Sequence, residues 1–148
     1  MSLGRYKKKR NFGKTPEPKG ETVKLRKSPI FVVHEHWARS HHFDFRLEIE
    51  GVLKSWAVPK GPPRNLGEKR LAIKVEDHPL EYASFKGEIP EGQYGAGKVE
   101  IWDQGRLEVL EKKKDSIHFS LFGKRLKGEF SLFQPPSFEK KNWLLMKK

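Results

Sequence analysis

Alternating apolar and polar residues dominate the chain and predict a protein made mainly of β-strands. In the clearest stretch, residues 42–49, the apolar positions are Phe43, Phe45, Leu47 and Ile49. The positions between them are ionisable: His42, Asp44, Arg46 and Glu48. Because successive side chains of a strand point to opposite faces, this stretch predicts a half-buried strand with an apolar back and an ionisable front.

Shorter alternating or apolar runs predict the remaining strands at residues 30–33, 52–58, 70–75, 99–102, 106–110, 117–122, 126–133 and 143–146. Turn signals separate them, among them Glu50-Gly51, residues 76–79 and residues 103–105. The glycine-rich residues 87–97 lack the Lys-Ser/Thr of a P-loop and are interpreted as a bend between strands. No segment has a helical stripe of useful length. The pattern predicts a compact antiparallel β-barrel of about eight strands with only short, peripheral helices.

The ionisable front of residues 42–48 is a candidate metal site. His42 and Asp44 are two residues apart on one strand face, roughly 6.5–7 Å at Cα, so both can hold one ion. His36, on the other side of a predicted bend, is the natural third ligand. Two imidazoles and one carboxylate leave coordination positions open, as a catalytic metal requires.

Basic and polar residues recur where a barrel could gather them near this strand. Lys60 stands at a strand end, Arg70 at a strand start and His78 in a turn. Together with Arg46 and a metal they would form a phosphate clamp, because Arg and Lys donors match phosphate oxygens.

Composition adds a compartment and a class of partner. The sequence holds no cysteine, which excludes a thiol nucleophile and Cys-ligated zinc, and its apolar runs are too short to cross a bilayer. We therefore expect a soluble, cytoplasmic protein.

The net charge is +12, and residues 1–28 carry ten Lys/Arg against two Glu. This predicts a basic N-terminal arm with little apolar burial, followed by one barrel domain at 29–148, and favours a polyanionic partner.

Several motifs resemble the 3′-phosphoesterase domain of bacterial ligase D and its stand-alone archaeal and bacterial relatives. They are residues 36–48 (His-Trp-Ala-Arg-Ser-His-His-Phe-Asp-Phe-Arg-Leu-Glu), 51–62, 75–82, 89–97 and the closing 142–147. In the arm, residues 9–18 (Lys-Arg-Asn-Phe-Gly-Lys-Thr-Pro-Glu-Pro) are similar to the family's N-terminal motif. The resemblance covers nearly the whole chain.

This resemblance implies a manganese-dependent enzyme, other divalent transition metals being possible, that heals DNA or RNA/DNA hybrid 3′ ends. It would remove a terminal ribonucleoside and then the 3′-phosphate, leaving a 3′-hydroxyl for a ligase and a polymerase in non-homologous end joining. The implied metal ligands are His36, His42 and Asp44. The implied catalytic residues are Arg46, Lys60, Arg70, His78 and Tyr82, with His78 a candidate to protonate the leaving oxygen. The implied substrate-binding residues are Arg10, Asn11 and Glu17.

Two positions depart from the family pattern. Asn11 stands where an Asp is usual, so we expect a better 3′-phosphatase than ribonucleoside-removing phosphodiesterase. His34 stands where Gln is common, and would either add a metal ligand or replace a supporting hydrogen bond.

Two other classes of protein fit part of the sequence. A non-haem iron oxygenase would use His42 and Asp44 with His78 or His118 as the third ligand. A non-catalytic nucleic-acid-binding barrel would use the aromatic residues as stacking platforms.

Overall fold

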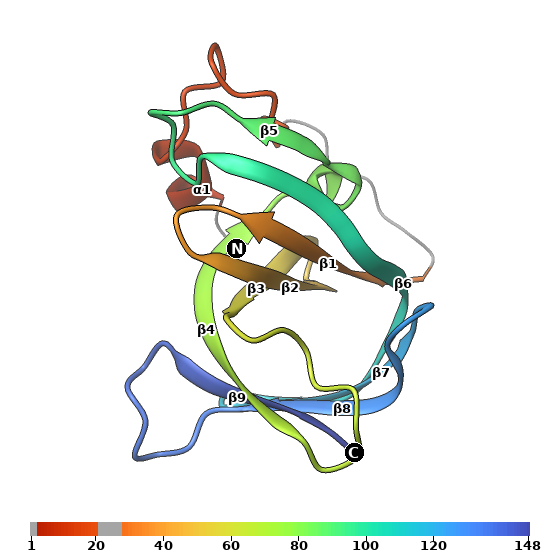
Figure 1. Ribbon diagram of the computed structural model, residues 1–148. Coiled ribbons are helices and arrows are strands. Elements are labelled where there is room, and N and C mark those ends of the chain that lie inside the picture. The colour runs from red at the N-terminus through yellow and green to blue at the C-terminus, as the bar shows by residue number, and fades with distance from the viewer. Residues whose placement is uncertain (1–2, 21–27) are drawn as a thin grey trace.

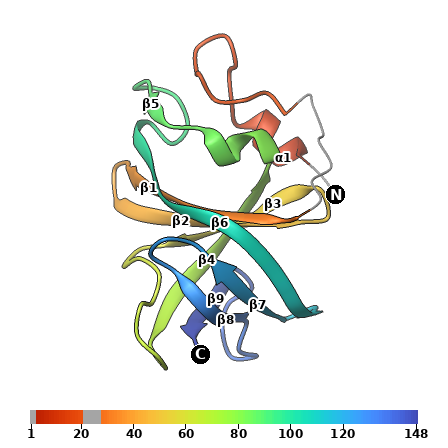
Figure 2. The ribbon, with the colours of Figure 1, turned by 90° about the vertical axis from the view of Figure 1, so that its right-hand side faces the viewer.

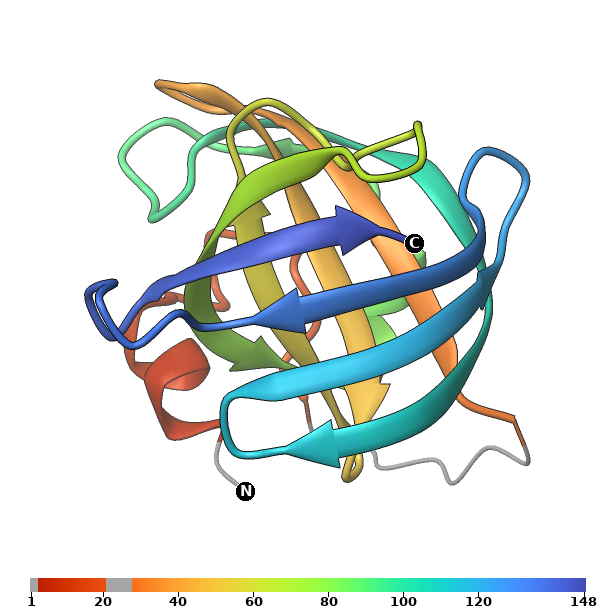
Figure 3. The ribbon, with the colours of Figure 1, turned by 90° about the horizontal axis from the view of Figure 1, so that it is seen from below.

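A closed antiparallel barrel forms the body of the protein, as the alternation predicts. The computed structural model describes residues 3–20 and 28–148. Its strands are β1 (Ile30–Trp37), β2 (His41–Ile49), β3 (Val52–Val58), β4 (Lys69–His78), β5 (Gly87–Ile89), β6 (Gly97–Lys113), β7 (Ser116–Phe122), β8 (Lys127–Phe133) and β9 (Asn142–Lys147). Eight of them follow one another in the order β1-β2-β3-β4-β9-β8-β7-β6, and the β1–β6 pairing closes the ring (Figure 3).

The interior of the barrel is filled by the apolar face of the strands. Phe45 and Leu47 of β2 are fully buried there with Trp56, Phe119 and Phe130. The predicted alternation is thus confirmed for β2, because Asp44 and Arg46 lie on the opposite, outer face.

A second apolar cluster covers the outer face of β1 and β3. It contains Val32 and Leu53 from the barrel wall, and Tyr6, Leu80, Tyr82, Ala83, Phe85, Ile89 and Val99 around them. The covering segments are the helix α1 (Gly4–Lys8), the 3₁₀ helix η1 (Leu80–Ser84) and β5, which pairs with β6. Figures 1 and 2 show these segments as a layer above the β1–β2–β3 wall. A cavity between this layer and the wall is where the site lies.

The N-terminal residues differ from the arm that the sequence predicts. Residues 4–8 form α1, and Tyr6 on it is fully buried against the barrel. Thr15 and Glu17 are also buried. The sequence does not reveal this docking, because α1 has five residues and only one of them, Tyr6, is buried. A single apolar position among Lys and Arg residues makes no periodic pattern. Residues 21–27 of the predicted arm lie outside the described residues.

The strand β6 corrects a second prediction. Residues 99–110, expected to be a hairpin turning at 103–105, form one strand that pairs with β1 along its first half and with β7 along its second. Gly105 is needed because the backbone of β7 approaches it closely, and not because the chain turns there. A Cβ at this position would lie 2.1 Å from the Phe122 carbonyl oxygen. The turn expected at 76–79 also lies partly in a strand, since β4 continues to His78.

None of the helices in residues 3–20 and 28–148 is long and apolar enough to cross a membrane.

Candidate functional site

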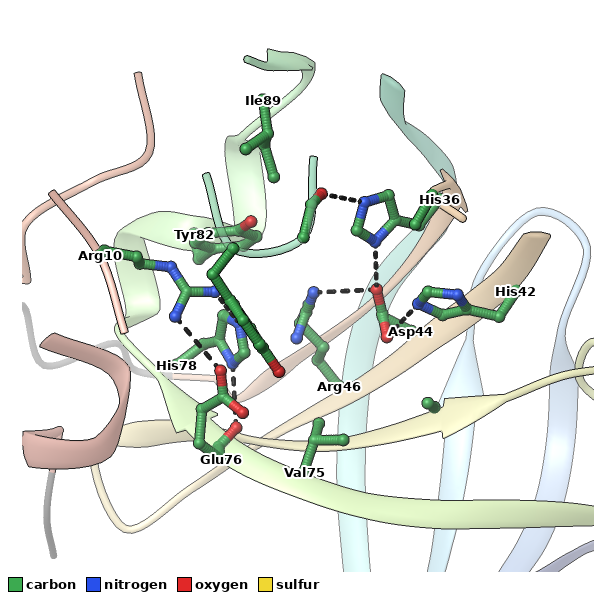
Figure 4. Close-up of a pocket in the computed structure, with 14 residues that line it drawn as sticks. Arg10, His36, His42, Asp44, Arg46, Val75, Glu76, His78, Tyr82 and Ile89 are labelled. Atoms are coloured by element: carbon green, nitrogen blue, oxygen red, sulfur yellow. Dashed lines mark hydrogen bonds and ion pairs between the residues drawn. The ribbon is translucent and has the colours of Figure 1, made fainter. Parts of the chain in front are cut away.

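The three predicted metal ligands meet on the outer face of the β1–β2 hairpin. His36 and His42 are cross-strand partners, and Asp44 is the next outward residue of β2. Asp44 lies between the two rings: Oδ2 is 3.4 Å from His36 Nδ1 and Oδ1 is 3.2 Å from His42 Nε2 (Figure 4). One ligand atom from each residue lies within 4.8 Å of the others.

Backbone carbonyls fix which nitrogen of each imidazole is free to bind. His36 Nε2–H donates to the Gly95 carbonyl at 2.7 Å, and His42 Nδ1–H donates to the Ser40 carbonyl at 2.8 Å. In its neutral form each ring would then direct a lone pair, at His36 Nδ1 and at His42 Nε2, toward the same carboxylate. Lone pairs that face a carboxylate repel it, so a cation or extra protons must lie between them. The hydrogen bonds to Gly95 and Ser40 are also typical of metal-ligating histidines, whose second ring nitrogen is commonly held by a hydrogen bond. The donor set fits a divalent transition metal.

The carboxylate at the centre is held in its charged form. Burial alone would raise the pKa of Asp44, but Arg46 and the two imidazoles lower it well below its ordinary value. The pKa of His42 is raised. Burial alone would lower this pKa, but the hydrogen bond to Asp44 favours the protonated ring and raises it. Asp44 is thus ionised over the whole physiological range, as a metal ligand must be.

Arg46 joins the metal-ligand cluster to the rest of the cavity. Its Nη2 lies 3.4 Å from Asp44 Oδ2, its Nε donates to His34 Nδ1 at 3.0 Å and its Nη1 donates to Ser55 Oγ at 3.0 Å. His34 in turn donates from Nε2 to the Phe85 carbonyl at 3.0 Å. Burial and the Arg46 charge lower the pKa of His34 to about 3. His34 is therefore a neutral hydrogen-bond acceptor that positions Arg46, and it is not part of the metal-ligand cluster.

A second group of polar residues lines the opposite end of the cavity. Arg10 donates to Glu17 Oε2 at 2.9 Å and to Glu76 Oε2 at 3.2 Å, and its Nη2 is 3.4 Å from His78 Nε2. Tyr82 Oη donates to the same Glu17 oxygen at 2.6 Å, and burial raises the Tyr82 pKa well above its ordinary value. Figure 4 shows Arg10, His78 and Tyr82 beside Arg46, whose guanidinium carbon is 4.9 Å from the Tyr82 ring centroid.

His78 is neutral in this environment. Burial and the charges of Arg46 and Arg10 lower its pKa well below its ordinary value. Because a guanidinium only donates, Nε2 accepts from Arg10, and Nδ1–H donates to the Glu76 carbonyl at 3.0 Å.

Both groups line one open cavity of about 320 Å³. It brings together seven of the residues that the sequence analysis singled out: Arg10, His36, His42, Asp44, Arg46, His78 and Tyr82. Glu17 is buried behind Arg10 and supports it.

The other three predicted residues do not line the cavity. Lys60 is exposed just after β3. Arg70, near the start of β4, binds Glu68 at 2.8 Å. Asn11 is exposed, and its Oδ1 accepts from Gly13 N within its own turn at 3.1 Å.

Seven of the residues that line the cavity were not assigned to the site by the sequence analysis, among them the polar residues Glu76 and Tyr94 and the glycine Gly95. The sequence analysis placed Glu76 in a turn, but it lies in a bulge of β4. Val75 pairs with Ser55 and His78 pairs with Leu53, so β4 has one residue more than β3 between these two pairs. This extra residue lets Val75, Glu76 and His78 all line the same cavity, which strict alternation forbids. Gly95 acts through its carbonyl, which no residue pattern reveals.

The ligand sets of the iron-oxygenase alternative are not assembled. His118 lies on β7, 2.9 Å from Glu129, and His78 is outside the cluster of possible ligands, whose third member is His36.

Comparison with known proteins agrees with this geometry. A family profile described as the DNA ligase D 3′-phosphoesterase domain matches residues 34–134. Multifunctional non-homologous end joining proteins LigD are similar along nearly the whole chain. The protein from Pseudomonas aeruginosa is 43% identical over 98% of this chain, and the one from Mycobacterium tuberculosis 49% over 89%. A third, from Mycolicibacterium smegmatis, is 43% identical over 96%. The chain spans only about a fifth of these relatives, 18–20% of their length.

Proposed function

The chain belongs to the DNA ligase D 3′-phosphoesterase domain family, and on this basis we propose that it removes 3′-terminal phosphate from nucleic acid. The product is a 3′-hydroxyl that a ligase or polymerase can use. One observation carries the proposal: the His36–His42–Asp44 cluster shares its cavity with two guanidinium groups, those of Arg10 and Arg46.

The cavity separates the tasks that phosphate hydrolysis needs. Arg46 faces the cluster and has donors for phosphate oxygens, which match a guanidinium in geometry and charge. A divalent metal, manganese in our proposal, bound by His36, His42 and Asp44 would neutralise phosphate charge and acidify a water molecule. Because His34 and Ser55 already fix Arg46, little reorganisation is needed when the phosphate arrives.

His78 is our candidate to protonate the leaving 3′-oxygen. Its Nε2 accepts from Arg10 in the cavity, and in our proposal it becomes free to take up a proton when Arg10 turns to the arriving phosphate, whose negative charge raises the pKa of the imidazole. The proton then passes from Nε2 to the 3′-oxygen as the P–O bond breaks.

Arg10, Glu17 and Tyr82 form the corner that we assign to a terminal ribonucleoside. Arg10 has donors for the sugar hydroxyls, and Glu17 holds both Arg10 and the Tyr82 hydroxyl in place. The proposed substrates are therefore DNA and RNA/DNA hybrid 3′ ends. The proposed setting is end joining beside ligase and polymerase activities.

Phosphate release from an oligonucleotide tests the proposal. A strand with a 3′-phosphate, and the same strand with a 5′-phosphate, are incubated with the protein in manganese or in chelator. We expect release from the 3′-phosphate strand alone and only with metal. Binding of both strands without any release would instead support the non-catalytic barrel.

A further inference from the structure

Four aromatic rings form a continuous row at the end of the barrel that carries the β1–β2 turn. Trp37 stacks on His41 with centroids 5.5 Å apart, His41 meets Phe43 at 5.4 Å, and Phe43 meets Trp102 at 5.5 Å. Trp37 is 39% exposed and His41 is exposed, while Phe43 and Trp102 are half-buried above the interior cluster. Trp37 and His41 thus present ring surface to solvent, while Phe43 and Trp102 are packed against the interior cluster.

Cationic side chains lie over both ends of this aromatic row. Lys98 Nζ is 5.4 Å from the Trp37 ring centroid, and the Arg64 and Arg125 guanidinium carbons are 5.8 and 4.8 Å from that of Trp102. Both arginines are exposed. Within the part of the chain that the structure describes, no carboxylate forms an ion pair with either guanidinium. Both are free to take phosphate oxygens.

Specific backbone features place these groups. Trp102 sits at a bulge of β6, where Val33 pairs with Asp103 and His34 with Ile101. The Asp103 carboxylate accepts hydrogen bonds from the backbone of the β7–β8 turn, at 3.1 Å from Arg125 N. This part-buried contact fixes the backbone of Arg125 near Trp102, and the exposed Arg125 side chain extends from there over the Trp102 ring.

The aromatic row is continuous with the active-site cavity across the β1–β2 turn. His36 and His42 face the cavity, and their neighbours Trp37 and His41 point to the other side of the hairpin. Ala38 in the turn lines the cavity, and Arg39 beside it is exposed. A strand whose 3′ end enters the cavity can therefore cross the turn and reach Trp37 without leaving the surface.

We propose that the aromatic row of Trp37, His41, Phe43 and Trp102 is a stacking platform for unpaired bases of the strand whose 3′ end is processed. The proposal rests on the proposed 3′-end activity for its direction of approach. Half-exposed rings flanked by cations are the features by which single strands are held: bases stack on the rings and cations take the phosphates. Lys98 at the Trp37 end is shared with Glu100 at 3.5 Å, so the two arginines beside Trp102 are the cations that the proposal uses.

A lysine-lined groove at the opposite end of the barrel is a weaker candidate. It is lined by Lys54, Lys74 and residues 112–114. Asp77 binds both Lys54 and Lys74, and Glu50 binds Lys112. These pairs neutralise much of the charge, and the groove serves here as a control surface.

Fluorescence anisotropy with a single strand of about ten nucleotides ending in a 3′-hydroxyl tests the platform. The first variant is Trp102→Leu, which keeps an apolar side chain over the interior. The second is Arg64→Ala/Arg125→Ala, both exposed and therefore compatible with folding. The matched control is Lys112→Ala/Lys113→Ala, which removes two charges at the far end of β6. We expect about tenfold weaker binding for each platform variant and a change within about twofold for the control.

A second readout separates this proposal from the proposed function. All variants should hydrolyse a 3′-phosphorylated dinucleotide at the wild-type rate, because so short a strand does not reach Trp102. If wild-type protein hydrolyses neither this dinucleotide nor a longer 3′-phosphorylated strand, the proposed function is contradicted, while anisotropy still decides the platform. Affinities of the platform variants within about twofold of wild type would overturn the platform, as would an equal loss in the lysine control.

Discussion

At the scale of single residues, a side chain was predictable where its chemistry and its strand parity coincide. His42, Asp44 and Arg46 share one face of one strand, so the sequence alone brings them together. Their supporting partners could not be predicted in the same way. His34 accepts from Arg46, and the Gly95 carbonyl accepts from His36, through contacts that depend on the register of β1 and on the loop before β6. Asn11 shows the converse limit, since a motif position placed it at the site and the structure gives it a local turn contact.

His78 should make the protein less stable as the pH falls. Burial, Arg46 and Arg10 hold its pKa well below 6.5, so below about pH 6.5 the unfolded chain binds a proton that the folded protein does not. The unfolding free energy therefore decreases as the pH drops through this range. Replacing His78 with Gln should flatten the decrease by up to about 1.4 kcal/mol per pH unit. Urea unfolding at a series of pH values measures both slopes, and equal slopes would show that His78 is not held neutral.

Glu17 should matter for both stability and the ribonucleoside-removing step. Its buried carboxylate accepts hydrogen bonds from Arg10, Thr15 and Tyr82. Gln supplies only one acceptor oxygen, so Glu17→Gln should lower the unfolding free energy by about 2–3 kcal/mol. It should also slow removal of a terminal ribonucleoside about tenfold or more, because Arg10 loses its anchor. Thermal unfolding and a gel assay on a primer with one 3′-ribonucleotide measure the two effects. An unchanged ratio of ribonucleoside removal to phosphate removal is the result that would contradict the role assigned to Glu17.

At the scale of elements, strands with regular alternation were predictable and irregular ones were not. The predicted bounds of β3 agree with the structure, and those of β2 differ by one residue. β6 was divided in two because its Asp-Gln-Gly stretch has the composition of a turn, whereas Asp103 there accepts hydrogen bonds from the backbone of a distant turn. Residues 4–8 were predicted as part of an arm because the docking of α1 depends on one buried tyrosine.

Tyr6 should therefore contribute strongly to stability. It is fully buried, its ring packs on His78 and Tyr82 at 5.1 and 5.9 Å, and its hydroxyl donates to the Pro18 carbonyl. Tyr6→Ala should lower the unfolding free energy by about 3–5 kcal/mol, as large-to-small changes at buried aromatic positions do. Tyr94→Ala, at a tyrosine that is 47% exposed, is the matched control and should cost less than about 1 kcal/mol. Similar shifts of the urea midpoint for the two variants would mean that α1 is not docked as described.

At the scale of the whole molecule, the barrel acts as a rigid wall whose outer face carries the chemistry. The barrel interior is filled by apolar side chains. The cavity lies on the outer face of the wall, under the layer of α1, η1 and β5 that Figure 2 shows above it. Residues far apart in the sequence, Arg10, Asp44 and His78, meet there. The alternation predicted the barrel, but it could not predict the covering layer, because that layer is held by a few buried residues of three segments too short to show a periodic pattern.

Turnover on a 3′-phosphorylated oligonucleotide by two histidine variants tests the central claim, that the outer-face cluster is the catalytic centre. His42→Ala removes one of the three proposed metal ligands, and His118→Ala removes a histidine of β7 that lies outside the cavity. With manganese present, we expect His42→Ala to lose about a thousandfold or more in rate. We expect His118→Ala to stay within about twofold of wild type. Near wild-type turnover by His42→Ala, or an equal loss in both variants, would contradict the account.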